Sequence, residues 1–82
     1  MEMTLKEAIA YRIIQLCKER TITPYALAMM SGMDKATVYN VLGYKSQNPQ
    51  VSTIKEICDG LDITLGQFFS TPEFDALEQE IK

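Results

Sequence analysis

The segment that most constrains the fold of this chain spans residues 23–45, where two short helical patterns are separated by only about three residues. Thr23 and Pro24 are typical of the N-cap and the first position of a helix, because threonine accepts from an unpaired backbone N–H and proline has no N–H to leave unpaired. Gly32 is expected to end this helix, since glycine reaches the left-handed conformation without a Cβ clash. Asp34 is expected to cap the next helix. So short a connection makes the two helices cross steeply, which is the helix-turn-helix arrangement.

Apolar residues within this segment recur at helical spacing and define an inward face. Leu27 and Ala28 share one face of the first helix, predicted over about residues 24–31. Val38, Val41 and Leu42 form the inward stripe of the second helix, predicted over about residues 35–42. The side chains left facing outward on the second helix are Lys35, Ala36, Thr37, Tyr39 and Asn40.

Helical patterns cover the chain on both sides of this unit. Thr4 and Glu7 have capping-box spacing, which predicts a first helix over about residues 4–20. Ser52 is expected to cap a helix that ends near Gly60, and Thr64 to start a short fifth helix. The expected core positions of these helices are Leu5, Ile9, Ile13, Leu16, Cys17, Ile54, Ile57, Cys58, Leu61, Leu65, Phe68 and Phe69. No segment alternates as a strand does, and 82 residues with 46% hydrophobic content suffice for one small domain, so the fold is predicted to be all-α.

A further amphipathic pattern lies in the acidic segment 71–82. Thr71 and Pro72 suit the N-cap and first helical positions, and Phe74, Leu77 and Ile81 fall at i, i+3 and i+7. The segment is expected to form a sixth helix after a domain of residues 1–70. Its apolar stripe has two interpretations, a lid over the chain's own core or a contact with a second copy in a dimer.

An ordered series of residues extends the pattern beyond the helix-turn-helix segment at about 23–43. The series consists of Lys45, Asn48, Pro49, the run from Ser52 to Cys58, Leu61, Ile63, Thr64, Leu65, Phe68 and Phe69. With these residues the chain resembles the Cro/C1-type (XRE, phage-repressor-like) helix-turn-helix DNA-binding family from about Leu5 to Phe69. The resemblance implies a five-helix, lambda-repressor-like DNA-binding domain, followed in this chain by the short C-terminal helix.

The resemblance also implies which residues read DNA bases. The family's base-reading positions correspond to Lys35, Ala36 and Asn40, with Thr37 at the edge of the groove. The chemistry is suitable, because lysine donates to guanine O6 and N7, asparagine pairs with adenine through two hydrogen bonds, and alanine or threonine methyls pack on the thymine methyl. The first turn of this helix is therefore expected to enter the major groove.

A second group of residues is expected to contact phosphates, which sets the register of the protein on DNA without reading its sequence. The family commonly has glutamine at the position of Pro24, which offers neither a side-chain donor nor an N–H, so a nearby hydroxyl is expected to substitute. The family usually has glycine at the position of Tyr44, so this chain departs from it there as well. The candidates for phosphate contact are Thr23, Tyr25, Tyr39, Tyr44, Lys45 and Ser46.

The distribution of charge bears on binding strength more than the net charge of −3 does. Residues 56–82 hold seven acidic side chains against Lys82, whereas residues 21–55 hold three lysines against Asp34. Since phosphate attraction acts over a Debye length of roughly 8 Å at physiological salt, the local face decides the attraction. The acidic segment is expected to point away from DNA. The few cations near the motif predict weak binding by a monomer and a need for dimerisation.

Several other classes of protein are not favoured. The chain has no histidine, no phosphate-binding glycine loop and no nucleophile paired with a base, so no enzyme, cofactor or metal site is expected. Cys17 and Cys58 lie on apolar stripes without CxxC spacing and are interpreted as buried thiols. No run reaches the roughly 18 apolar residues of a membrane span, and the N-terminus lacks the apolar stretch of a signal peptide, so a cytoplasmic location is expected.

Two functions remain open from the sequence. The first is a sequence-specific transcriptional regulator, a repressor that binds a palindromic operator in double-stranded DNA as a homodimer. The alternative is an antitoxin-like or adaptor module of the same fold, whose acidic C-terminus binds a basic protein partner. The cluster of Met29, Met30 and Met33 also favours an adaptable protein-binding surface, because thioether side chains are flexible.

Overall fold

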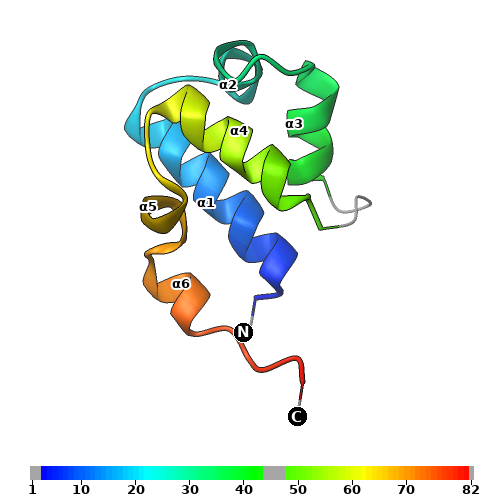
Figure 1. Cartoon of the computed structure of the whole chain (residues 1–82), viewed down its shortest axis with the longest axis vertical. Helices are drawn as coiled ribbons and strands as arrows, with labels where there is room; N and C mark the ends of the chain where they lie inside the picture. The colour runs from blue at the N-terminus through cyan, green and yellow to red at the C-terminus, as the bar shows by residue number, and fades with distance from the viewer. Residues whose placement is uncertain (1–2, 44–47, 82) are drawn as a thin grey trace.

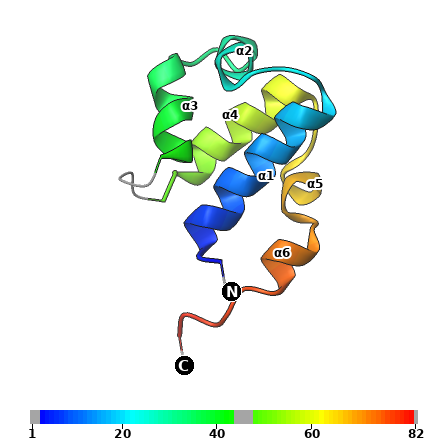
Figure 2. The same cartoon turned by 180° about the vertical axis from the view of Figure 1, so that it is seen from behind.

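The computed structural model describes residues 3–43 and 48–81, and these two stretches contain helices and no strand. Two views from opposite sides show α1 and α4 crossing the middle of the molecule, α2 and α3 at one end, and α6 with the C-terminal segment at the other (Figures 1 and 2). The helices are α1 (Leu5–Glu19), α2 (Pro24–Met30), α3 (Lys35–Leu42), α4 (Val51–Leu61), α5 (Leu65–Phe69) and α6 (Pro72–Asp75). The predicted all-α fold is therefore confirmed.

Threonine hydroxyls cap the N-termini of three helices, as the sequence predicts. At α1, Thr4 Oγ1 accepts the Glu7 N–H at 3.1 Å and Glu7 Oε1 accepts the Thr4 N–H at 2.8 Å, which completes a capping box. Thr23 Oγ1 accepts the Ala26 N–H at 3.1 Å in the same way, and Thr64 forms a second capping box with Gln67. Each hydroxyl satisfies a backbone donor that the first turn of a helix leaves unpaired.

Three helices also end in one shared way, with a left-handed residue followed by an apolar residue that folds back onto the core. The backbone N–H of the apolar residue donates to a carbonyl five residues earlier at 3.0–3.1 Å, which is the Schellman motif. The left-handed residues are Thr21 (φ 56°), Gly32 (φ 67°) and Asp62 (φ 58°), and the apolar residues after them are Ile22, Met33 and Ile63. The glycine signal predicts the turn after α2, but the sequence shows no comparable signal for the turns after α1 and α4.

Basic side chains of α1 cap the C-terminal ends of three other helices. The last carbonyls of a helix lack intrahelical partners and carry partial negative charge, so a cationic donor both satisfies and stabilises them. The bonds run from Lys6 Nζ to Val41 O at the end of α3, from Arg12 to Phe68 O (2.8 Å) and Gln67 O (2.9 Å) at the end of α5, and from Arg20 to Leu61 O (2.8 Å) at the end of α4. Helix α1 thus tethers α3, α4 and α5 by their ends as well as by its apolar face.

The core contains the residues expected from helical spacing. Its buried members are Ile9, Ile13, Leu16, Cys17, Leu27, Ala28, Val38, Val41, Ile54, Ile57, Cys58, Leu61 and Phe68. Leu5, Leu42, Leu65 and Phe69 are partly buried at its edge. Every helix from α1 to α5 contributes, so the helix-turn-helix unit is held by the flanking helices rather than by itself.

The N-terminus of α4 differs from the prediction. Gln50 is the N-cap and Val51 the first helical residue, so Ser52 lies inside the helix and its hydroxyl contacts Gln50 Oε1 at 3.3 Å. The Gln50 carbonyl accepts the N–H groups of Thr53 and Ile54, which starts the helix without a capping side chain. At α3, Asp34 is the N-cap as predicted, but its carboxylate makes no capping hydrogen bond with a described residue.

The sixth helix is much shorter than predicted. Only Pro72–Asp75 is helical, and residues 76–81 are not. Phe74 packs against Phe69 and Phe68, with ring centroids 4.9 and 6.1 Å apart, whereas the Ile81 side chain is 90% exposed. A longer helix would place Glu78 and Glu80 at its negative C-terminal end, which is unfavourable. Within the expected stripe, Phe74 therefore packs against the core, Leu77 is partly buried and Ile81 is exposed.

Helices α2 and α4 approach closely at Gly60. A Cβ placed on Gly60 would lie 2.3 Å from Ser31 Oγ and 3.0 Å from Ser31 Cα, and the latter is a backbone atom that cannot rotate away. The small residue at position 60 therefore sets the distance between α4 and the end of α2.

We expect Gly60→Ala to destabilise the fold by about 1–3 kcal/mol, because the added methyl must push two packed helices apart. This loss outweighs the gain of up to about 1 kcal/mol that alanine brings in a helix interior. Gly66→Ala is the matched control, since its Cβ would meet nothing nearer than Thr64 Oγ1 at 3.8 Å. Thermal unfolding followed by circular dichroism measures both variants. Equal midpoints for the two variants would contradict the close approach.

Candidate nucleic-acid interface

Helices α2 and α3 form the exposed end of the molecule, opposite α6 and the C-terminal segment (Figure 1). Val38 and Val41 are buried and fix how α3 is rotated about its own axis. This rotation places Lys35, Ala36 and Asn40 in solvent and leaves Thr37 partly exposed. The four residues predicted to read bases thus share an accessible surface on the outer helix of the motif.

Lys35 also makes a contact that the sequence analysis missed. Its ammonium group lies 5.8 Å from the centroid of the Tyr25 ring, across the gap between α3 and α2. An ammonium within about 6 Å of an aromatic face is attracted by the electrons of the ring. The two residues are ten positions apart on different helices, so no periodicity within one helix indicates the pair.

The residues predicted to contact phosphates are placed as follows. Thr23 Oγ1 accepts the Ala26 N–H, and the hydroxyl hydrogen remains able to donate. Tyr25 and Tyr39 are 50% and 48% exposed, on α2 and α3 respectively. The remaining three candidates, Tyr44, Lys45 and Ser46, lie outside the described residues.

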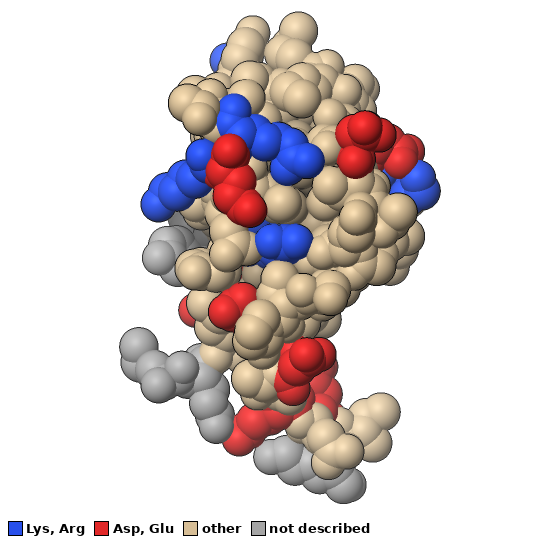
Figure 3. All heavy atoms as spheres, turned by 90° about the vertical axis from the view of Figure 1, so that its left-hand side faces the viewer, with Lys and Arg blue, Asp and Glu red and all other residues tan. Residues whose placement is uncertain are grey.

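Positive charge is sparse on this end of the molecule. Helices α2 and α3 together contain one basic residue, Lys35. Three cations of α1 are directed at helix ends, and Lys55 pairs with Asp59 one turn away on α4. Acidic side chains gather at the lower end of the molecule, over α6 and the segment after it, whereas the basic side chains lie higher on the same face with other acidic side chains beside them (Figure 3). The acidic residues of α6 and the segment after it therefore lie at the opposite end of the molecule from α2 and α3.

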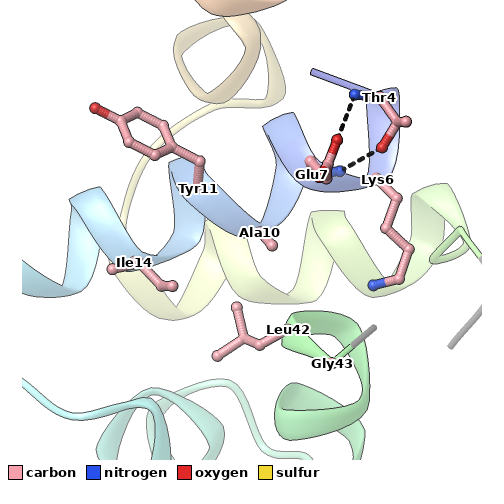
Figure 4. Close-up of a pocket in the computed structure, with 8 residues that line it drawn as sticks. All are labelled: Thr4, Lys6, Glu7, Ala10, Tyr11, Ile14, Leu42 and Gly43. Atoms are coloured by element: carbon pink, nitrogen blue, oxygen red, sulfur yellow. Dashed lines mark hydrogen bonds between the residues drawn. The ribbon is translucent and has the colours of Figure 1, made fainter. Parts of the chain in front are cut away.

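An open groove of about 530 Å³ lies beside the interface, between α1 and the end of α3. Ala10 and Ile14 of α1 face Leu42 of α3 across it (Figure 4). Lys6 and Glu7 also line it, but Lys6 caps α3 and Glu7 belongs to the capping box of α1. Among the residues that the structure describes, none of those predicted to read bases or contact phosphates lines the groove.

Comparison with known proteins identifies the family to which this arrangement belongs. The model of the Cro/C1-type helix-turn-helix DNA-binding domain matches residues 12–73. The chain therefore belongs to the Cro/C1-type helix-turn-helix family of DNA-binding transcription regulators. No curated protein matches the chain. Among the described residues, no helix is long and apolar enough to cross a membrane.

Two solved structures are similar to the chain over most of its length. The prophage Lp1 protein 11 is 25% identical, with a TM-score of 0.81, and the match covers 94% of this chain and 100% of that one. A tyrosine-to-phenylalanine mutant of the restriction-modification controller protein C.Esp1396I is also 25% identical. Its TM-score is 0.72, and the match covers 84% of this chain and 86% of that one.

The two thiols lie in the core, away from this interface. Cys17 and Cys58 are free and buried, on α1 and α4. Burial raises the pKa of both thiols, because the thiolate would lose its hydration. Both groups therefore bind protons more tightly in the folded chain than in the unfolded chain.

We expect the stability of the protein to fall as the pH rises above about 8.5, where the thiols of the unfolded chain ionise. Below that pH their contribution is fully present, and above it each thiol lowers the free energy of unfolding by up to about 1.4 kcal/mol per pH unit, until the folded-state pKa is reached. Urea unfolding between pH 7.5 and 9.5 measures the slope. A Cys17→Ala, Cys58→Ala variant should show a shallower slope, and an unchanged slope would contradict the assignment.

Proposed function

We propose that the protein is a sequence-specific transcriptional repressor of the cytoplasm that binds a palindromic operator as a homodimer, without a catalytic step. The observation that carries the proposal is the exposed first turn of α3, held by two buried valines in a member of a DNA-binding family. In the docking geometry of this motif, that turn enters the major groove while the preceding helix crosses the backbone.

Each exposed side chain of α3 has a role suited to its chemistry. Lys35 donates to O6 and N7 of guanine, and Asn40 forms a pair of hydrogen bonds with adenine. Ala36 and Thr37 offer methyl groups to thymine. These contacts supply sequence preference, since phosphates are the same at every position.

Hydroxyl groups and the residues that follow α3 in the chain supply the contacts to phosphate. Thr23 and Tyr39 donate from α2 and α3, and Tyr44, Lys45 and Ser46 follow α3 in the chain. Tyr25 has two available roles, donation from its hydroxyl to a phosphate or support of Lys35 through its ring.

Dimerisation compensates for the weak charge of a single copy. Two half-sites bound together raise affinity through effective concentration, without a new contact to DNA. Of the three residues proposed for the dimer contact, Phe74 packs on its own core, Leu77 is partly buried, and Ile81 is almost fully exposed. Leu77 and Ile81 are therefore the apolar side chains that a second copy would cover.

We expect the Lys35→Ala, Asn40→Ala double variant to lose most of its preference for the operator, because each lost base contact costs about 1–3 kcal/mol. Binding-site selection from a random duplex library defines the operator, and fluorescence anisotropy then compares it with a scrambled duplex. Lys18→Ala is the matched control, since Lys18 is exposed on α1, at a distance from α3 in the chain. Sequence-independent binding by the parent, or full preference in the double variant, would overturn the proposal.

We expect deletion of residues 76–82 to convert the dimer into a monomer and to weaken operator binding by more than about tenfold. The deletion retains Phe74, so the core keeps its lid. Sedimentation equilibrium measures the mass, and anisotropy measures the affinity. A Glu78→Gln, Glu80→Gln variant, which keeps Leu77 and Ile81, should remain dimeric. A deleted chain that stays dimeric would rule out this dimer surface.

The adaptor function remains the second candidate because two methionines of α2 face solvent. Met29 and Met30 are 65% and 50% exposed, whereas Met33 packs against the core. If the chain is an adaptor, the same deletion of residues 76–82 should leave DNA binding intact and should remove a protein that copurifies with the full chain. The mass and affinity measurements on the deleted chain therefore separate the two candidates.

A further inference from the structure

The first turns of α2 and α3 meet through Tyr25 and Lys35. Tyr25 is the second residue of α2 and Lys35 is the first residue of α3, with the ammonium 5.8 Å from the ring centroid. Both side chains are exposed, so the pair lies on the surface proposed to face DNA. Lys35 forms no ion pair with any described residue, and the neighbouring Asp34 makes no capping bond.

A lysine at this position needs an orienting contact to discriminate among bases. Its ammonium is a compact charge on a flexible four-carbon stem, and it binds phosphate as readily as a base edge. An aromatic face restricts where the ammonium lies without neutralising it. The ring itself is well placed to do so, because Thr23 caps the turn that carries it and Pro24 restricts the backbone before it.

We propose that Tyr25 is a positioning residue for recognition, whose ring holds the Lys35 ammonium toward the base edges. The inference rests on the proposed function and assigns to the ring a role that the sequence analysis gave to the hydroxyl. The two roles depend on different parts of the side chain, the aromatic ring in one case and the hydroxyl in the other. A positioning ring is preserved in phenylalanine and lost in leucine, whereas a phosphate-binding hydroxyl is lost in both.

The decisive experiment compares operator discrimination among Tyr25→Phe, Tyr25→Leu and the parent. Anisotropy measures the affinity for the selected operator and for a duplex in which the base pair proposed to contact Lys35 is changed. The ratio of these two affinities is the discrimination of each protein. We expect Tyr25→Leu to lose about two- to fivefold of this ratio per half-site, the range of an exposed cation–π contact. Tyr25→Phe should retain the ratio, and affinity for the changed duplex should be similar in all three proteins. An affinity ratio that falls equally in Tyr25→Phe and Tyr25→Leu, or that does not fall in Tyr25→Leu, would overturn the inference.

A second measurement detects the contact in the free protein. The ring current of Tyr25 should shift the Lys35 ε-methylene protons upfield in the NMR spectrum, and the shift should persist in Tyr25→Phe and vanish in Tyr25→Leu. Tyr11→Leu is the matched control, because Tyr11 is a similarly exposed tyrosine on α1. A Lys35 resonance unaffected by Tyr25→Leu would overturn the inference.

The parent protein separates failure of this inference from failure of the proposed function. If the parent prefers the operator and Tyr25→Leu prefers it to the same degree, the positioning role is overturned and the repressor proposal stands. A parent that binds every duplex equally overturns the repressor proposal, and the positioning role with it. Circular dichroism confirms that each variant folds, which is expected because half of the Tyr25 side chain is already in solvent.

Discussion

The arrangement of the helices depends on the cationic side chains that α1 places against the C-terminal ends of its neighbours. Lys6 and Arg12 lie along α1 and Arg20 is its C-cap residue, and the three side chains reach the ends of α3, α5 and α4 respectively. Each bond satisfies carbonyls that a helix cannot pair internally, and each places positive charge at the negative end of a helix dipole. Because α1 is already anchored by its buried apolar face, these bonds also fix the positions of the helices that it caps.

This use of charge has a consequence for recognition. Three of the eight basic residues stabilise the fold, Lys55 pairs with Asp59, and helices α2 and α3 themselves contain one basic residue, Lys35. Nonspecific attraction to DNA comes largely from counterion release by such cations. In the proposed function, recognition therefore depends on short-range contacts from α3 and on two copies binding together. The proposed contact of Lys35 with the Tyr25 ring fits this dependence, because orienting the ammonium group strengthens its short-range contact with a base.

The features that could be predicted are those governed by residues close together in the chain. The caps at Thr4, Thr23 and Thr64 and the turn at Gly32 involve partners within a few positions, and the structure confirms them. The left-handed residues Thr21 and Asp62 escaped prediction, because burial of the isoleucine after each one imposes the conformation. The predicted length of α6 was wrong because it, too, depends on packing between segments. Its apolar spacing suits a helix, but Phe74 packs against the aromatic rings of α5 whereas Ile81 is exposed.

By itself, the sequence determined helices α1 to α5, the helix-turn-helix unit and which side chains of α3 face outward, because capping and apolar periodicity act within about four residues. Only the tertiary structure decided how the cations of α1 are used, why position 60 requires glycine, and that Lys35 lies over the Tyr25 ring. These contacts join residues between ten and more than fifty positions apart, so they depend on how the helices pack. The candidate interface was therefore predictable as a set of exposed residues, whereas the contact between its two helices was not.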